Sequence, residues 1–323
     1  MTDANDAETA DVSALDTTKA SELTDRVIDT VTDVIVGKND VVEDVLVTVL
    51  ARGHLLIEDV PGVGKTTLAK AIAGSFDASF KRVQFTSDLL PSDITGVNVF
   101  NQRTDEFDFQ PGPVFANFVL GDEINRAPPK TQSALLEAME ERQVTTDGVT
   151  RTLPDPFCVI ATQNDVEPGR TYDLPVAEVD RFTKKVRLGY PGTDEESRML
   201  GRMVDDRVGH PVESIDSVAG VTTLRQARAT AASVETTVPL RGYVARLAAH
   251  TRRNATLGVS PRGSLALLRA AQARAVLNGR DYVVPDDVQR EAQTVLAHRI
   301  RADSSGTSGT DIVDEALSSV PVE

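Results

Sequence analysis

Apolar residues recur along the chain with two different periods, and the change of period divides the chain into parts. From Leu23 to Ile35, and again over residues 41–52, apolar residues lie at helical spacing on one face. Between residues 55 and 190, short apolar runs alternate with helical segments, as in a parallel sheet joined by crossover helices. After Pro191 and Gly192 the chain is rich in Ala, Arg and Leu. We therefore expect an α/β core followed by a smaller all-α domain.

Several short apolar runs are predicted to be core strands, and two further segments are predicted to be hairpins. The predicted strands cover residues 55–58, 82–86, 118–122, 157–163 and 186–188. Hairpins are expected at residues 97–115 and 143–150, because apolar and polar residues alternate there around turn-forming residues. A helix is predicted between them at residues 133–141.

Composition sets both ends of the chain apart from these domains. The start consists of Asp, Thr, Ala and Glu with almost no large apolar side chain, so it cannot bury enough surface to order itself. The end is rich in Ser, Gly and Thr, with a possible short helix at residues 312–317. The predicted organisation is a disordered acidic tail (1–20), a core (21–190), a helical domain (191–301) and a flexible tail (302–323).

A Gly-rich turn lies between the first core strand and a helical pattern that opens at Lys65. Backbone N–H groups of such a turn and of the following helix N-terminus converge on an anion. Lys65 is placed to reach the β- and γ-phosphates of a nucleotide, and the Thr66 hydroxyl is placed to bind Mg²⁺. The segment predicted to bind ATP comprises Pro61, Gly62, Val63, Gly64, Lys65, Thr66 and Thr67.

The loop departs from the strict phosphate-binding pattern at one position. Asp59 stands where G-x-x-x-x-G-K-[ST] has its first glycine. A residue other than Gly is tolerable there if its φ stays negative. A strand, a Gly-rich turn and a helix without any ligand is the alternative to a nucleotide site.

Polar side chains lie at the ends of two later predicted strands. Asp122 and Glu123 follow residues 118–121, and Asn164 follows residues 157–163. An Asp at a strand tip can hold Mg²⁺ together with Thr66, and a neighbouring Glu can polarise the attacking water. Each residue alone is an ordinary strand ending. Downstream of a phosphate-binding loop they indicate hydrolysis, with Asn164 placed near the water or the γ-phosphate.

Composition excludes several other classes of protein. The net charge is −15 and lysine is scarce, which indicates an acidic surface of the kind adapted to high salt and disfavours nucleic acid as a partner. Cys158 is the single cysteine and lies in an apolar run, so we expect a buried thiol and no intrachain disulfide. The four histidines lack ligand spacing.

No apolar stretch approaches the length of about 18 residues that a membrane span needs. The start of the chain shows no basic and then apolar leader. We therefore expect a cytoplasmic protein without a membrane span.

The chain resembles the MoxR family of AAA+ ATPases in four stretches. These are the phosphate-binding loop, residues 122–132, residues 161–164, and Leu174-Pro175 with residues 180–182. The resemblance covers roughly residues 20 to 300. It implies a P-loop NTPase with a three-layer αβα core, inserted β-hairpins and an all-α lid. It also implies a homo-oligomeric ring, usually hexameric, with ATP at the subunit interfaces.

The resemblance also implies roles for single residues. Asn164 matches sensor 1, and Arg181 matches an arginine finger that reaches the γ-phosphate of a neighbouring subunit. Arg262, in the first turn of a predicted lid helix, matches sensor 2 and would contact the γ-phosphate within its own subunit. Arg126 is a second candidate for action across the interface. The adenine is expected against the backbone of Val36 and Gly37, at the end of the first helix.

The resemblance implies a ring that hydrolyses ATP with Mg²⁺ and thereby remodels or assembles a client protein. MoxR-like ATPases commonly work with von Willebrand factor A domain proteins, which are therefore expected partners. Three alternatives stay open: a magnesium-chelatase-type ATPase subunit, a DNA-acting AAA+ ATPase, and a nucleotide-dependent scaffold that does not hydrolyse ATP. A DNA-acting protein predicts basic hairpin tips, whereas the first hairpin carries Asp105, Glu106 and Asp108.

Overall fold

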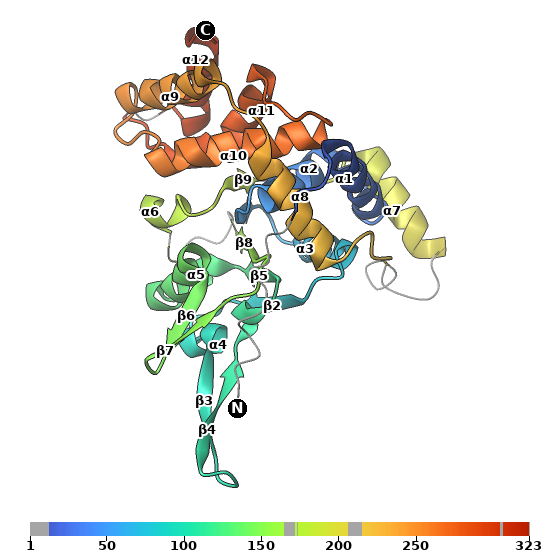
Figure 1. The fold of residues 1–323 in the computed structure, drawn as a ribbon, viewed down its shortest axis with the longest axis vertical. Coiled ribbons are helices and arrows are strands. Elements are labelled where there is room, and N and C mark those ends of the chain that lie inside the picture. Colours follow the sequence, from blue (N-terminus) through green and yellow to red (C-terminus); the bar gives the residue numbers. More distant parts are fainter. Residues whose placement is uncertain (1–12, 165–171, 173, 206–214, 304–305, 323) are drawn as a thin grey trace.

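Five parallel strands form the central sheet of the computed structural model, which describes residues 13–164, 172, 174–205, 215–303 and 306–322 (Figure 1). Their order is β2-β5-β8-β1-β9. The strands are β1 (Leu55–Glu58), β2 (Phe80–Gln84), β5 (Phe118–Asp122), β8 (Cys158–Gln163) and β9 (Lys184–Val186). The strand that precedes the Gly-rich turn therefore lies beside the strand that leads to Asn164, and β5 with its two carboxylates is next in order.

Apolar side chains alternate between the two faces of this sheet, and helices cover both faces. Leu55 and Ile57 belong to one hydrophobic cluster, whereas Leu56 belongs to the other. The first cluster includes α1 (Thr17–Thr32), α2 (Asn39–Leu50) and α3 (Lys65–Ser75), and the second includes α4 (Pro91–Thr95) and α5 (Pro129–Glu141). The predicted three-layer αβα core is confirmed.

Two hairpins extend from the core at the positions that the alternation predicts. The longer one pairs β3 (Gly96–Asn101) with β4 (Glu106–Pro111), and the shorter one pairs β6 (Gln143–Thr146) with β7 (Val149–Thr152). Figure 1 shows the longer hairpin projecting well beyond the sheet. Three short helical turns, η1 (Pro113–Phe115), η2 (Ile124–Arg126) and α6 (Val176–Val179), complete this part of the core.

The remaining helices form the second domain. They are α7 (Thr193–Asp205), α8 (Val221–Ser233), α9 (Val238–Arg253), α10 (Pro261–Leu277), α11 (Pro285–Leu296), η3 (Ala297–Arg299) and α12 (Gly309–Ser319). The central helix α10 packs against α8, α9 and α11, and also against α1 and α2 of the core. One hydrophobic cluster therefore continues from the core into the helical domain.

The first predicted tail contains helix that the composition did not suggest, and the last contains a longer helix than the sequence predicts. The first helix begins at Thr17 because Asp16 caps it, accepting from the Thr18 N–H at 2.9 Å, and because Ala20 is buried in the core. At the other end, α12 covers residues 309–319, and its residues Ile312 and Val313 are buried. The predicted disorder is therefore wrong for residues 17–20, and the helix predicted at residues 312–317 is confirmed with longer bounds. Residues 1–12 lie outside the described residues.

Among the described helices, none is long and apolar enough to cross a membrane. Cys158 is buried on β8 as predicted, and burial raises the pKa of its thiol to about 12.

Buried charges join the core to the helical domain. Lys184 on β9 is fully buried, donates to Asp44 of α2 at 2.5 Å and is ion-paired with Glu291 of α11. Arg274 of α10 donates to the same Glu291 at 2.7 Å and is ion-paired with Glu43. Because Glu291 is fully buried, its charge depends on these two cations.

We predict that Lys184→Met lowers stability strongly, because it leaves buried carboxylates without one of their cations. Removing one partner of a buried ion pair costs about 3–5 kcal/mol. The matched control is Lys185→Met, since Lys185 pairs with Glu58 at a partly exposed site and should lose about 1 kcal/mol or less. Thermal unfolding of both variants checks this, and equal losses would contradict the proposed role of Lys184.

Burial keeps His54 neutral between the sheet and α5. The Val159 N–H donates to Nδ1 at 3.0 Å, and Nε2 lies 3.2 Å from the Met139 carbonyl oxygen, so the ring proton sits on Nε2. Burial lowers the pKa of His54 from 6.5 to about 3.

This shift predicts a loss of stability in acid. The unfolded chain protonates His54 below pH 6.5, but the folded chain does so only near pH 3, so stability present above pH 6.5 is lost as the pH falls between these values. The slope from this group is about 1.4 kcal/mol per pH unit. His54→Gln should flatten the pH dependence of the unfolding free energy in this window. An unchanged slope would mean that His54 is not held neutral.

Candidate functional site

The Gly-rich loop after β1 forms one wall of a cavity of about 640 Å³. Gly62 and Gly64 adopt φ values of 87° and 93°, and an added Cβ at Gly62 would meet open space. The loop therefore needs glycine for its backbone conformation rather than for lack of room. The lining residues are Pro61, Gly62, Gly64, Lys65, Thr66, Thr67, Arg82, Gln84, Thr86, Asp122, Glu123, Arg126 and Asn164.

Lys65, the first residue of α3, lies at the centre of this site. Its Nζ donates to the carbonyl oxygen of Asp59 at 2.9 Å and to Oδ1 of Asn164 at 3.3 Å. Burial lowers the pKa of Lys65 from its ordinary value, and the carboxylates of Asp59, Asp122 and Glu123 oppose that shift. A buried ammonium with so few partners is suited to binding an anion.

Asp59 has a structural reason to replace the first glycine of the loop. Its φ is not positive, so the position does not need glycine. Its side chain accepts from the Val60 N–H at 2.8 Å and from the Gly189 N–H at 2.6 Å. Asp59 therefore ties the start of the loop to the segment that follows β9.

Asp122 ends β5 with both carboxylate oxygens engaged. Oδ1 accepts from the Thr162 hydroxyl at 2.6 Å, and Oδ2 accepts from Arg82 Nη2 at 2.6 Å. The Arg82 guanidinium thus occupies the position in which another cation, such as a metal ion, would contact this carboxylate. Thr66 and Asp122 line the same cavity, and one hydroxyl with one carboxylate fits Mg²⁺, which takes its other ligands from water and phosphates.

Glu123 is held by three side chains and has a left-handed φ of 56°. Oε1 accepts from Asn164 Nδ2 at 2.5 Å, and Oε2 accepts from Gln84 Nε2 at 2.7 Å and from Arg126 Nη1 at 2.9 Å. A carboxylate fixed in this way beside Lys65 has the position and the charge of a general base. Arg126, which the sequence placed at the interface, contacts Glu123 of its own chain.

Arg82 and Gln84 are site residues that no sequence pattern predicted. Both lie on β2, where Gln84 pairs in register with Asp122. The alternation along this strand was visible, but strand order was not, so nothing in the sequence placed β2 beside the carboxylates.

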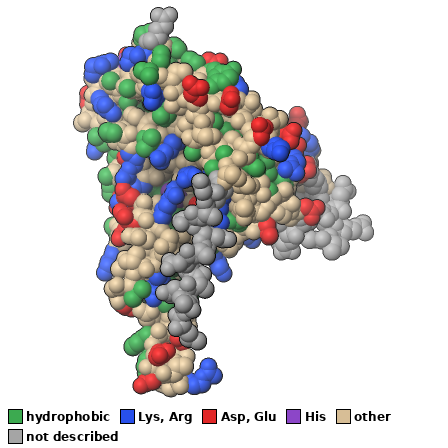
Figure 2. All heavy atoms as spheres, in the orientation of Figure 1, with side chains coloured by type: hydrophobic (Ala, Val, Ile, Leu, Met, Phe, Trp, Pro, Cys, Tyr) green, Lys and Arg blue, Asp and Glu red, His purple; other side chains and the backbone are tan. Residues whose placement is uncertain are grey.

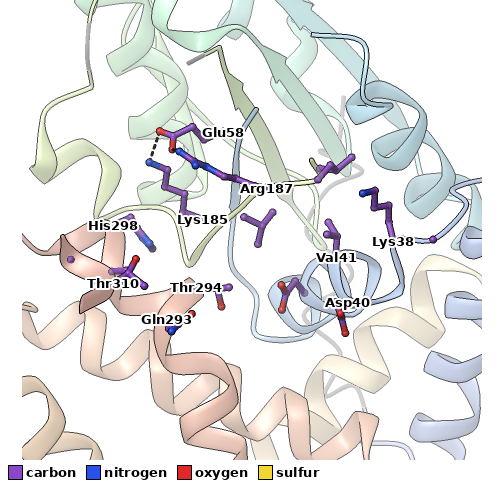
Figure 3. A pocket seen from close by; sticks show the side chains of 16 residues that line it. Lys38, Asp40, Val41, Glu58, Lys185, Arg187, Gln293, Thr294, His298 and Thr310 are labelled. Carbon is purple, nitrogen blue, oxygen red and sulfur yellow. Dashed lines mark hydrogen bonds and ion pairs between the residues drawn. The ribbon is translucent and has the colours of Figure 1, made fainter. Parts of the chain in front are cut away.

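Val36 and Gly37 lie beside the loop but outside the phosphate cavity. The Ile35 side chain comes within 4.0 Å of the point where a Gly64 Cβ would stand, so this segment contacts the loop. Gly37 lines a larger cavity of about 720 Å³ between α2, β9 and the helices α11 and α12 (Figure 3). Val36 is buried, and Val63 packs on the hydrophobic core instead of lining the phosphate cavity.

Arg181 and Arg262 are not brought to the loop. They line a separate cavity of about 300 Å³ that shares no residue with the phosphate cavity. Glu140 of α5 holds both: Oε2 pairs with Arg181 Nε at 3.1 Å, and Oε1 pairs with Arg262. The structure places Arg262 away from the loop of its own subunit, whereas the sequence predicts that it contacts the γ-phosphate there. The physical reason is that α10 packs against α1 and α2, which directs its first turn toward α5.

Fold and site together define a P-loop ATPase of the AAA+ class with a helical lid. Residues 54–184 match the ATPase family associated with various cellular activities (AAA), and residues 247–316 match the AAA lid domain. A crystal structure from Cytophaga hutchinsonii superposes with a TM-score of 0.88 at 36% identity, covering 95% of this chain and 96% of that one.

Two curated relatives narrow the class to a family. Protein YeaC of Bacillus subtilis is 47% identical over 92% of this chain and 94% of its own length. Chaperone MoxR1 of Mycobacterium tuberculosis is 42% identical over 85% of this chain and 75% of its own length. The chain belongs to the MoxR family of AAA+ ATPases.

We predict that Asp59→Gly destabilises the protein but leaves nucleotide binding intact. The change removes two hydrogen bonds to a buried carboxylate, which costs about 2–4 kcal/mol together, while the backbone carbonyl that Lys65 contacts remains. Thermal unfolding and binding of a fluorescent ATP analogue check both parts. Loss of nucleotide binding at a temperature where the variant is folded would show that Asp59 acts on the ligand directly.

Proposed function

We propose that the protein binds ATP with Mg²⁺ and hydrolyses it to ADP and phosphate. The observation that carries this proposal is that Lys65, Asn164 and Glu123 form one hydrogen-bonded chain inside the loop cavity. Lys65 and the loop N–H groups bind the phosphates, and Glu123 takes the proton of the attacking water. Asn164 orients that water between them.

Thr66 and Asp122 are the residues that hold the metal in this proposal. Bound Mg²⁺ supplies positive charge that neutralises the β- and γ-phosphate oxygens. For Asp122 to serve, the Arg82 side chain, which is about half exposed, must leave its carboxylate. Arg82 then remains near the phosphates as a further cation.

The site is completed by a neighbouring subunit in this proposal. Arg181 and Arg262 line a cavity away from their own loop, so they serve the ATP of another protomer in a homo-oligomeric ring, which we take to be a hexamer. A guanidinium supplied across the interface stabilises transition-state charge. Glu140 keeps the two arginines together until that phosphate replaces its carboxylate.

The hairpin of β3 and β4 supports action on a client protein. Phe100 and Phe107 face one another across the two strands, with their ring centroids 5.3 Å apart. The two residues are 46% and 69% exposed. Exposed aromatic pairs on a projecting element favour contact with another protein. By family resemblance we propose a von Willebrand factor A domain protein as partner. The acidic hairpin tip, with Asp105 and Glu106, disfavours DNA.

Steady-state ATP hydrolysis tests the catalytic part. Specific turnover should rise with protein concentration, because each site needs a neighbour. Glu123→Gln should lower turnover by at least about a hundredfold while ATP binding stays, because an amide cannot accept the proton. Arg181→Ala should lower turnover about a thousandfold, because the guanidinium that stabilises transition-state charge is removed.

The matched control is Arg103→Ala, an exposed arginine on the hairpin tip that should leave turnover unchanged. If the wild-type protein binds ATP but shows no turnover at any concentration, with or without a client, the protein is a nucleotide-dependent scaffold. Stimulation of turnover by DNA would favour the DNA-acting alternative.

A further inference from the structure

A further cavity lies beside the cavity that holds Arg181 and Arg262, and guanidinium groups line it. It has a volume of about 430 Å³ and lies between α2, α8, α10 and the end of α5. The residues that line it are Leu50, Ala51, Arg52, Arg142, Arg228, Ala231, Ala232, Arg269 and Gln272. Among these lining residues there are four arginines and no carboxylate, in a protein whose net charge is −15.

Arg228 is the deepest of the four and is incompletely paired. Its side chain is 2% exposed, and its Nε donates to the Val49 carbonyl oxygen at 2.8 Å. Nη1 reaches Asp155 only at 3.5 Å, and Nη2 has no hydrogen-bond acceptor among the residues that the structure describes. Burial lowers the pKa of Arg228 to about 10. An unpaired buried donor of this kind is costly unless a ligand satisfies it.

The other three arginines add further positive charge to the cavity. Within the described parts of the chain, no carboxylate forms an ion pair with Arg52, Arg142 or Arg269. Arg142 Nη2 donates to the backbone carbonyl of Arg52 at 3.2 Å, which holds the Arg142 side chain beside the Arg52 backbone. Burial, followed by the charges of Arg52 and Arg269, lowers the pKa of Arg142.

One carboxylate, that of Asp155, lies near these arginines but does not line the cavity. It is 64% exposed and is shared between Arg225 at 3.8 Å and Arg228 at 3.5 Å, both long contacts. Asp155 opposes the lowering of the Arg142 pKa but cannot balance the cluster. A surplus of guanidinium charge therefore remains around the cavity.

We propose that this cavity is a binding site for a phosphate-class oxyanion. Guanidinium groups match phosphate oxygens through paired N–H donors, and the buried Nη2 of Arg228 lacks just such an acceptor. The volume accommodates a pyrophosphate-sized group.

The anion has two possible sources. The cavity shares Ala51, Arg52, Arg142 and Arg269 with the cavity that holds Arg181 and Arg262. Lys and Arg side chains gather on this face between α10 and α5 (Figure 2). The phosphoryl group therefore comes either from a free anion or from the nucleotide of a neighbouring subunit, and the second source rests on the proposed function.

Calorimetric titration of pyrophosphate into the full-length Lys65→Ala variant tests the site. The background change removes phosphate binding at the Gly-rich loop, so remaining binding reports on other sites. At dilute protein and constant ionic strength in chloride, we expect equimolar binding. Arg269→Gln and Arg52→Gln should each weaken it by about tenfold or more. Both side chains are exposed, so folding does not depend on them, whereas Arg228 also supports the Val49 carbonyl.

Arg103→Gln on the hairpin tip is the control and should bind pyrophosphate normally. If dilute protein does not bind pyrophosphate, but Arg269→Gln raises the KM for ATP at ring-forming concentrations without changing kcat, the nucleotide-borne source is supported. Binding that survives both Arg269→Gln and Arg52→Gln shows an adventitious ion only and overturns the proposal. Absence of an arginine-dependent effect in both arms also overturns it. The pyrophosphate arm does not require ATP hydrolysis, so its result is independent of the proposed function.

Discussion

The hydrogen-bonded chain from Lys65 through Asn164 to Glu123 is the interaction on which the account of this site depends. It exists because parallel strands end at one edge of a sheet, so that residues far apart in the sequence meet there. The order of β5, β8 and β1 brings the Glu123 strand, the Asn164 strand and the loop strand together. The same edge brings Asp122 and Thr66 to the wall of one cavity, which supports the proposal that they hold Mg²⁺.

Positive charge in this protein is divided between two faces, and the division is the basis for proposing that a neighbouring subunit completes the site. Lys65 lies with the carboxylates in the loop cavity, whereas Arg181, Arg262 and the arginines around Arg228 lie on the face between α5 and α10. The buried pairs of Lys184 and Arg274 with Glu291 join core and helical domain, which fixes that separation. In the proposed ring, assembly brings the two faces together.

Local patterns predicted much of this structure, and long-range packing supplied the rest. The Gly-rich turn, the strand-end carboxylates and both hairpins follow from short segments, and the structure has them. The order of the strands does not follow from such segments, so Gln84 and its hydrogen bond to Glu123 were missed. The placement of α10 is also a tertiary property, and it moved Arg262 away from its own phosphates. Helix at Thr17 was missed because the buried face there is short and the flanking composition is polar, whereas the short helix predicted at residues 312–317 lies within α12.

Mixing two inactive variants measures the division of the site most directly. Glu123→Gln subunits lack the base, and Arg181→Ala subunits lack the arginine supplied to a neighbour. In a mixed ring, an Arg181→Ala subunit with an intact Glu123 can receive Arg181 from a Glu123→Gln neighbour, so an interface with both groups forms. The account predicts that ATP hydrolysis, absent from each variant alone, returns on mixing. If the mixture stays inactive while rings of both variants still assemble, the two residues do not serve one site across an interface.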